Sequence, residues 1–126
     1  MKPLHQSDLF GWSVFNEEKN MDFNGVFWQR AGGNVVVDPV EISLHDAQHM
    51  EALGGVAWIV ITNGDHTRAV ESLRERTGAK VAGPAGERES LDLACDAWLA
   101  DGDSLVEGLV AIALNGSKTP GELALL

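Results

Sequence analysis

The feature of this sequence that most limits its fold is an apolar strand that runs directly into a polar turn. Residues 56–61 are apolar without any alternation with polar residues, so we expect a strand that is buried on both faces. A segment with helical periodicity begins a few residues later. Proteins of the α/β class build sites where a buried strand ends. The first candidates for a functional site are therefore the five residues that follow the strand: Thr62, Asn63, Gly64, Asp65 and His66.

The remaining pattern predicts a mixed arrangement of strands and helices. Ser43 is a favourable N-cap for a helix that runs to about residue 53, where two glycines would end it. Asp65 is expected to cap a second helix that runs to about Thr77 and ends at Gly78. Strands are predicted at residues 9–15, 25–30, 35–37, 56–61, 80–84, 97–99, 109–114 and from 122 onward, with a tight turn at 31–34 and a short helix or turn at 87–93.

The order of these elements indicates one domain. The first strands would form a hairpin, and strands alternate with helices in the middle of the chain. We therefore expect a single domain over residues 1–126, of the α/β (α+β) class, with a mixed β-sheet and helices on one face. The four tryptophans lie in strand-like runs and are expected to pack in the core or at an interface.

Charge and cysteine content exclude several classes of partner. The formal net charge of −10 disfavours nucleic acid and anionic membranes, because both need basic patches on the protein. The single cysteine, Cys95, excludes an intrachain disulfide and a cysteine-based zinc cluster, and is expected to act as a small buried hydrophobe. No segment approaches the ~20 apolar residues of a membrane span. The first residues lack the apolar stretch of a secretory signal, so a cytoplasmic location is the expectation.

The turn resembles the signature of the metallo-β-lactamase-fold superfamily, which is His-x-His-x-Asp-His at this place. Asp65 and His66 match the final Asp-His, whereas Asn63 stands where a metal-binding histidine is found. Ile61 stands at the first histidine of the signature, so two of its four metal ligands are replaced. Lys118 stands in a Gly-Ser-Lys-Thr-Pro-Gly segment similar to the family's Gly-His-Thr-Pro-Gly, again in place of a ligand. Asp38 follows an early strand that ends in aspartate in the family.

This resemblance implies half of an αββα sandwich, because complete family members are substantially longer. The chain stops in an apolar run, which indicates either a truncated chain or a half-length product that completes itself with a partner. A lone half would leave an apolar sheet face in water, and such faces are rare in soluble monomers. We therefore expect a homodimer in which two copies take the places of the two halves, with the residual sites near the interface.

The resemblance does not extend to a complete metal site. One imidazole and one carboxylate are too few for zinc, and the Lys118 ammonium would repel a metal ion. We expect no metal and no other cofactor; zinc held by Asp65 and His66 is the alternative. Lys118 could instead pair with Asp65 and so replace metal by a salt bridge. Simpler roles also exist for these residues: a helix cap for Asp65 and a turn residue for Asn63 or Asp38.

Three hypotheses for function follow from the sequence. The first is a relative that has lost metal-dependent hydrolysis and binds a small ligand through Asn63, Asp65, His66 and Lys118. The second is a metal-dependent hydrolase of an ester or thioester, whose site is completed across a dimer or by C-terminal residues. The third is a structural interaction protein with no ligand. His45 and His49, four residues apart on the first predicted helix, have no evident third ligand and are interpreted as surface histidines.

Overall fold

A computed structural model describes all 126 residues. Its main element is a mixed seven-stranded sheet in which neighbours in the sequence are neighbours in the sheet. Strands β1 to β4 pair antiparallel, and β4 to β7 pair parallel. The predicted mixed sheet is therefore confirmed. Its strands are β1 (Lys2–Pro3), β2 (Leu9–Asn16), β3 (Met21–Trp28), β4 (Val35–Val37), β5 (Trp58–Val60), β6 (Lys80–Pro84) and β7 (Ala97–Leu99).

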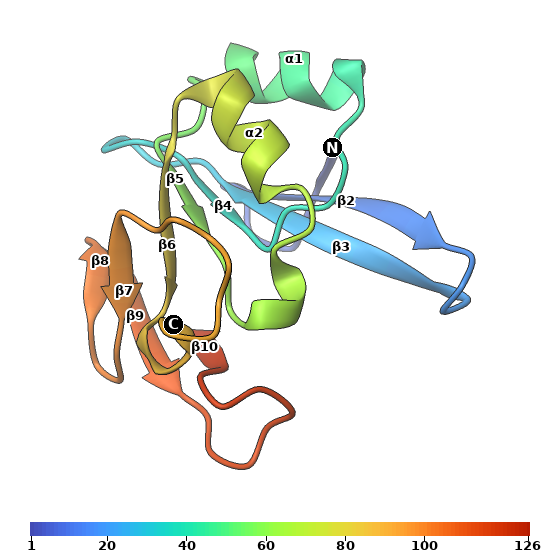
Figure 1. Ribbon diagram of the computed structural model, residues 1–126. Helices are drawn as coiled ribbons and strands as arrows, with labels where there is room; N and C mark the ends of the chain where they lie inside the picture. The colour runs from blue at the N-terminus through green and yellow to red at the C-terminus, as the bar shows by residue number, and fades with distance from the viewer.

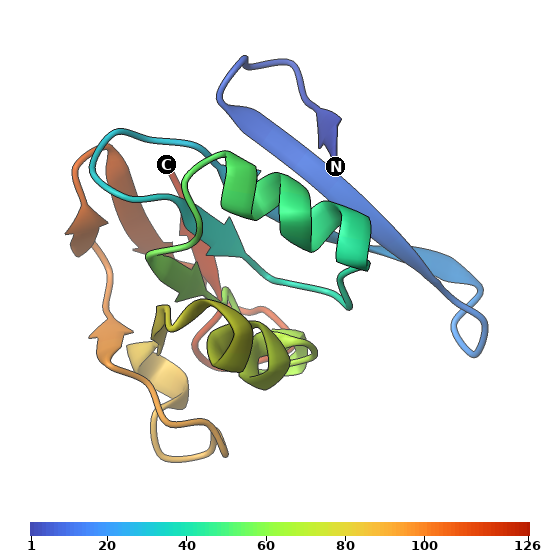
Figure 2. The same ribbon diagram turned by 90° about the horizontal axis from the view of Figure 1, so that it is seen from above.

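Two helices, α1 (Leu44–Ala52) and α2 (Val70–Thr77), cover one face of this sheet (Figures 1 and 2). Ser43 caps α1 by accepting a hydrogen bond from the Asp46 N–H, and Gly78 ends α2 in the left-handed conformation. Met50 and Leu73 of the helices share one buried cluster with Phe27, Ile59 and Val81 of the sheet. The prediction of helices on one face is confirmed.

A second, three-stranded antiparallel sheet covers part of the opposite face. Its order is β10-β9-β8, formed by β8 (Ser104–Val106), β9 (Leu109–Ala113) and β10 (Leu123–Leu125). Leu109, Ala111 and Leu123 pack there against buried residues of the large sheet, among them Val60 and Leu99. The small sheet therefore covers part of a face that a half fold was expected to leave in water, because alternate residues of β9 turn inward onto it.

The local structure after β5 differs from the prediction. Asp65 does not cap a long helix; Asn63 caps a single 3-10 turn, Gly64–His66, by accepting a hydrogen bond from the Asp65 N–H. Helix α2 begins only at Val70 and has no side-chain cap. The amide of Asn63 competes successfully because its backbone is extended, so that its side chain reaches the N–H two residues ahead. The short helix or turn predicted at residues 87–93 is present in part, as the end of a second 3-10 turn, Ala85–Glu87, and a hydrogen-bonded turn over residues 88–90.

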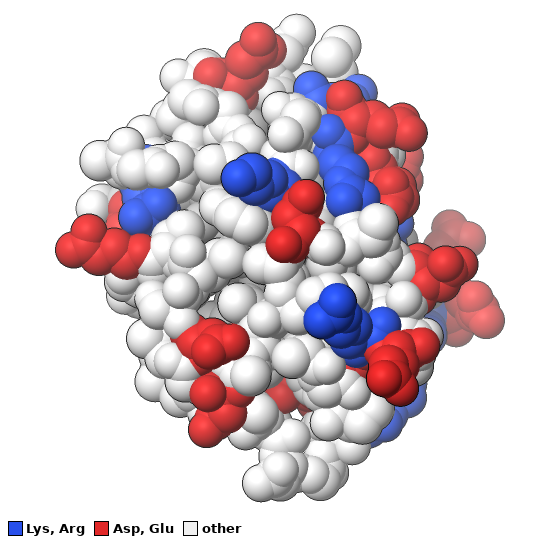
Figure 3. Space-filling model, turned by 60° about the vertical axis from the view of Figure 1, so that its left-hand side comes forward, with Lys and Arg blue, Asp and Glu red and all other residues white.

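Charged side chains are mixed at the surface. On the face shown in Figure 3, Lys and Arg side chains lie beside Asp and Glu side chains, and no separate basic patch is visible there. None of the helices is both long enough and apolar enough to cross a membrane.

Candidate functional site

The site begins where two parallel strands end side by side. Val37 of β4 lies opposite Val60 of β5, so Asp38 and Thr62 meet just beyond these strands. The Thr62 N–H donates to Asp38 Oδ1 at 2.8 Å, and the Thr62 hydroxyl donates to Asp38 Oδ2 at 2.6 Å. Asp38 has a φ of 47°, in the left-handed region that Asp and Asn adopt more readily than most residues. The sheet therefore directs this carboxylate toward the turn of residues 62–66, which we call the motif turn.

The same carboxylate holds His66. The distance from His66 Nδ1 to Asp38 Oδ2 is 3.1 Å, and the side chains are 34% and 16% exposed. His66 Nδ1 also lies 3.3 Å from Thr62 Oγ1, and its Nε2 lies 3.4 Å from Asn63 Nδ2. A hydrogen on Nδ1 directed at Asp38 would leave Nε2 as the acceptor nitrogen. The imidazole is thus oriented by protein groups at both nitrogens.

Asn63 lies beneath the turn rather than facing a ligand. Its side chain is buried, Oδ1 accepts from the Asp65 N–H at 2.9 Å, and Nδ2 donates to Glu122 Oε1 at 3.3 Å. Both ends of the amide therefore have contacts within the protein. These contacts favour the role as a turn residue over direct ligand binding.

Glu87, which the sequence interpretation did not single out, also supports the turn. It is 3% exposed, and both of its carboxylate oxygens lie 3.1 Å from the Gly64 nitrogen. A Cβ on Gly64 would lie only 2.8 Å from Glu87 Oε1, so any larger residue there would displace this carboxylate. Glu87 belongs to a charged run, Glu87-Arg88-Glu89, and nothing in that run marks one acid as buried. Only the fold brings it under the turn.

Asp65 and Lys118 form the ion pair that the sequence suggested. Lys118 Nζ lies 3.1 Å from Asp65 Oδ2. The pair is not buried, since the Lys118 side chain is 82% exposed and that of Asp65 is 55% exposed. Solvent and salt screen an interaction of this kind strongly. The ion pair is therefore a weak surface interaction.

Arg68 connects the turn to the long β2–β3 hairpin. Its Nη2 donates to the Asp38 carbonyl oxygen at 2.6 Å and to that of Asn24 at 3.4 Å, and its guanidinium lies 5.5 Å from the Phe23 ring centroid. Its buried Nε has no hydrogen-bond partner. Burial lowers the pKa of Arg68, and the nearby Asp38 carboxylate opposes that shift. The sequence analysis gave Arg68 no role.

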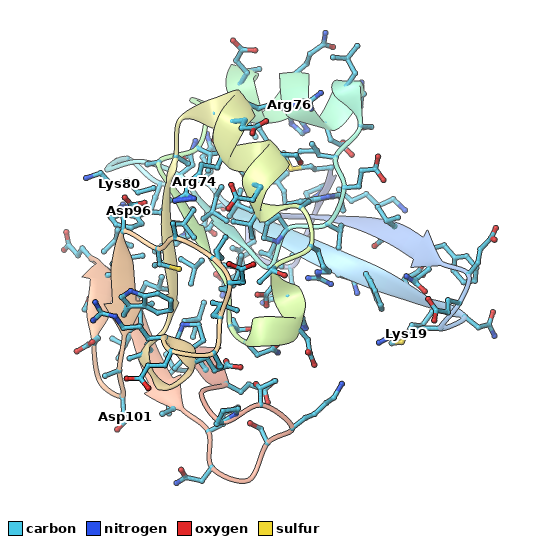
Figure 4. The ribbon with its side chains drawn as sticks, in the orientation of Figure 1. Lys19, Arg74, Arg76, Lys80, Asp96 and Asp101 are labelled. Carbon is cyan, nitrogen blue, oxygen red and sulfur yellow. The ribbon has the colours of Figure 1, made fainter.

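A hollow of about 410 Å³ lies between this hairpin and the motif turn. Asp38, Asp65 and His66 form one wall, whereas Asn63 and Lys118 are not part of the lining. Lys19 lies at the tip of the hairpin, on the other side (Figure 4). Three of the five predicted site residues thus line the hollow, and the other two contact them from outside it. The other lining residues are Met21, Asp22, Phe23, Asn24 and Arg68.

The donor atoms at this place do not fit a zinc ion. Asp65 points to Lys118, and His66 Nδ1 points to Asp38. Ile61, at the first histidine position of the signature, is fully buried in the core. No three His, Cys, Asp or Glu side chains in the chain are grouped so that they could hold a metal ion. A zinc site wants about three or four such donors around one point.

Cys95 is a poor nucleophile in this fold. It is partly buried against the helix-side core, and burial raises the pKa of its thiol to about 11. Arg74, which lies 3.8 Å from Asp96 (Figure 4), lowers that pKa, while Asp96 raises it further. A thiol that stays protonated near neutral pH reacts slowly. Cys95 therefore has no part in the candidate site.

Comparison with known proteins gives a consistent result. A family model described as "Metallo-beta-lactamase superfamily" matches residues 1–126. Among solved structures, a Cronobacter sakazakii metallo-beta-lactamase with a "HARLDQ motif" is 20% identical, with a TM-score of 0.67, over 98% of this chain and 57% of its own.

Two further structures show the same similarity. A beta-lactamase from Chitinophaga pinensis is 20% identical, with a TM-score of 0.65, over 82% of this chain and 49% of its own. A metallo-beta-lactamase from Staphylococcus aureus is 12% identical, with a TM-score of 0.66, over 94% of this chain and 37% of its own. The chain therefore spans about half the length, or less, of these similar proteins. No curated protein sequence matches it significantly.

Proposed function

The chain belongs to the metallo-beta-lactamase superfamily, and from that premise we propose that it binds a small ligand at the motif turn instead of catalysing metal-dependent hydrolysis. The observation that carries this proposal is the hollow of about 410 Å³. Its wall contains Asp38, Asp65 and His66, and the atoms that would bind metal are engaged by other protein groups. A concave site with a few convergent polar groups is a typical place for a small ligand.

The charges around the hollow favour a ligand with an anionic group. Of the three carboxylates that line it, Asp38 and Asp65 already contact His66 and Lys118. Arg68 and Lys19 also line it, and neither forms an ion pair with a carboxylate. A guanidinium fork and an ammonium group are suited to a carboxylate or a phosphate. Phe23 adds an apolar surface between them.

Departure from the signature does not by itself decide between binding and hydrolysis. The similar Cronobacter protein carries a HARLDQ motif and is still described as a metallo-beta-lactamase. The proposal rests instead on where the donor atoms of this chain point. Because Ile61 and Asn63 are buried under the turn, residues supplied by a second subunit or by additional chain could not restore ligands at these two positions.

The test is a titration of isotope-labelled protein with inorganic phosphate and with acetate, followed by amide NMR. We expect saturable shifts at Gly64, His66 and Arg68, and we expect His66→Gln to weaken them. His45→Gln is the matched control, because His45 is an exposed histidine on α1, outside this hollow. The control should bind as the unaltered protein does.

Two outcomes would overturn the proposal. Stoichiometric zinc in dialysed protein, together with cleavage of a chromogenic ester that His66→Gln abolishes, would establish the hydrolase. The absence of any saturable shift at the hollow with either anion would instead favour an interaction protein without a ligand.

A further inference from the structure

Asparagine is followed directly by glycine at Asn24, Asn63 and Asn115. In such a pair the glycine nitrogen can attack the side-chain amide carbon of the asparagine, because glycine has no Cβ to hinder the close approach. A bond forms between that nitrogen and that carbon, and the side-chain nitrogen leaves as ammonia with the proton of the glycine N–H. Water then opens the resulting succinimide at either carbonyl group, which gives aspartate or isoaspartate. The sequence does not distinguish the three pairs, but their contacts do.

The first pair is held within a sheet. Asn24 and Gly25 belong to β3 and lie opposite Ser13 and Trp12 of β2. Asn24 Oδ1 accepts a hydrogen bond from the Ser13 hydroxyl at 2.6 Å. A Cβ on Gly25 would lie 2.5 Å from Trp12 Cζ2, so the indole fills the space beside this glycine. Reaction at Asn24 therefore requires that the two strands first separate.

The second pair is held within the motif turn. The Asn63 side chain is buried, and its amide contacts the Asp65 N–H at one end and Glu122 at the other. The Gly64 N–H is directed at the Glu87 carboxylate, with both oxygens at 3.1 Å. The attacking nitrogen and the amide carbon that it would attack are thus both fixed by other contacts.

The third pair has none of these restraints. Asn115 is exposed, and neither its side chain nor the Gly116 N–H makes a hydrogen bond within the protein. A Cβ on Gly116 would meet no atom within 4 Å. The pair lies at the start of the loop between β9 and β10, which projects from the rest of the molecule (Figure 1). The Asn115 side chain can therefore rotate until its amide carbon meets the glycine nitrogen.

From this contrast we propose that Asn115 is a site of spontaneous deamidation, which adds a negative charge to the loop that carries Lys118. The base of the loop is closed by a hydrogen bond from the Leu114 N–H to the Glu122 carbonyl oxygen, at 2.8 Å. Residues 115–119 make no backbone–backbone hydrogen bonds, so the longer backbone of isoaspartate can be accommodated there without loss of the fold.

The new carboxylate would lie in the same loop as an existing ion pair. Lys118 contacts Asp65 at 3.1 Å, and a carboxylate at position 115 would compete for the same ammonium group. The charge on the outer side of the motif turn would thus change with the age of the protein. This inference does not depend on the ligand proposed above, because it concerns only the reactivity of the chain itself.

Peptide mapping by mass spectrometry tests the proposal on the tag-free chain, kept folded in mildly alkaline buffer. We expect Asn115 to convert at least about tenfold faster than Asn24 or Asn63, because those two residues react only after local opening. The same chain unfolded in guanidinium chloride is the control, and all three pairs should then convert at similar rates.

Isoelectric focusing of aged protein supplies a second readout. We expect a more acidic form to accumulate, and Asn115→Asp should focus at the same position, since both carry the added carboxylate. Asn115→Gln should prevent this form, because glutamine would have to close a larger ring. Equal rates at the three asparagines of the folded chain would overturn the proposal. So would an Asn115 that stays intact in the folded chain under conditions in which the unfolded chain reacts.

Discussion

Two pairs of side chains flank the motif turn at the same separation, and they differ in burial and in their other contacts. His66 to Asp38 and Lys118 to Asp65 are both 3.1 Å apart. The first pair is partly buried, and its carboxylate also accepts the Thr62 N–H and hydroxyl. The second pair is largely exposed, and neither of its side chains makes another hydrogen bond within the chain. The distance between two side chains therefore does not by itself show how much the pair contributes to the stability of the fold.

The two pairs differ in stability because a group that loses its partner is left unpaired if it is buried, whereas water solvates it if it is exposed. A buried donor left without an acceptor costs about 1–3 kcal/mol, because water cannot replace the lost contact. An exposed ammonium or carboxylate is hydrated again at once, and such pairs contribute about 0–1 kcal/mol. We infer that the contacts on the inner side of the turn, made by Asp38, Thr62, His66 and Glu87, stabilise its conformation. Asp65 and Lys118, on the outer side, add surface charge but little stability.

Replacement of Asp38 by alanine should have the largest effect. It removes the acceptor of two Thr62 donors and the partner of His66, and alanine disfavours the φ of 47°. We expect a loss of about 2–4 kcal/mol in the free energy of unfolding, measured with urea. Asp38→Asn is the control, since asparagine tolerates this backbone conformation and keeps one acceptor. A loss below about 0.5 kcal/mol for alanine would contradict the role given to the inner side.

Glu87→Ala should follow, with a loss of about 1–3 kcal/mol in the free energy of unfolding. The partly buried contact of the Gly64 N–H with the carboxylate would be lost. Glu87→Gln retains an acceptor oxygen and should cost less. Hydrogen exchange of the Gly64 amide should accelerate in the alanine variant only. Equal losses for both variants would show that the contact itself is not what matters.

Asn63→Ala should cost about 1 kcal/mol, the usual value for the loss of a capping side chain. Its amide caps the 3-10 turn and reaches Glu122. Asn115→Ala is the matched control, because Asn115 is an exposed asparagine in the loop before Lys118. The control should unfold at the same urea concentration as the unaltered protein. An equal destabilisation of the control and of Asn63→Ala would contradict the role of the Asn63 side chain as a stabilising cap.

The Lys118 and Asp65 pair should have the smallest effect. A double-mutant cycle with Lys118→Ala and Asp65→Asn should give a coupling energy below about 0.5 kcal/mol, and that value should vanish near about 1 M salt. A coupling above about 1 kcal/mol, insensitive to salt, would show that this pair is structural. In that case both sides of the turn would contribute to stability, which would contradict the difference inferred here.

The parts of the fold that could be predicted from the sequence have local signals. Ser43 and Gly78 mark helix ends, and the apolar run before the turn marks a buried strand, because capping and burial patterns depend on near neighbours. The pairing of Lys118 with Asp65 was also predictable, since it needed only opposite charges at positions aligned by the family resemblance. Strand β8 was not predicted, since it spans only Ser104–Val106 and is irregularly paired.

The buried support of the site could not be predicted in the same way. Glu87 and Arg68 act across long sequence separations, on Gly64 and on the hairpin, and each lies among polar residues that look solvent-exposed. Asp65 illustrates the opposite error: its position suggested a helix cap, but Asn63, two residues earlier, caps a 3-10 turn there, and α2 has no side-chain cap. Competition between two polar residues this close in the sequence depends on backbone angles that the sequence does not state.

Thermal unfolding of the tag-free protein, with and without zinc, tests most directly whether protein contacts hold the turn in place of a metal. A ligand that binds only the folded state raises the unfolding temperature by mass action. We predict that neither equimolar zinc nor a chelator shifts the midpoint by more than about 1 °C. A rise of several degrees with zinc that the chelator reverses would contradict the account, and would show that the turn is a metal site after all.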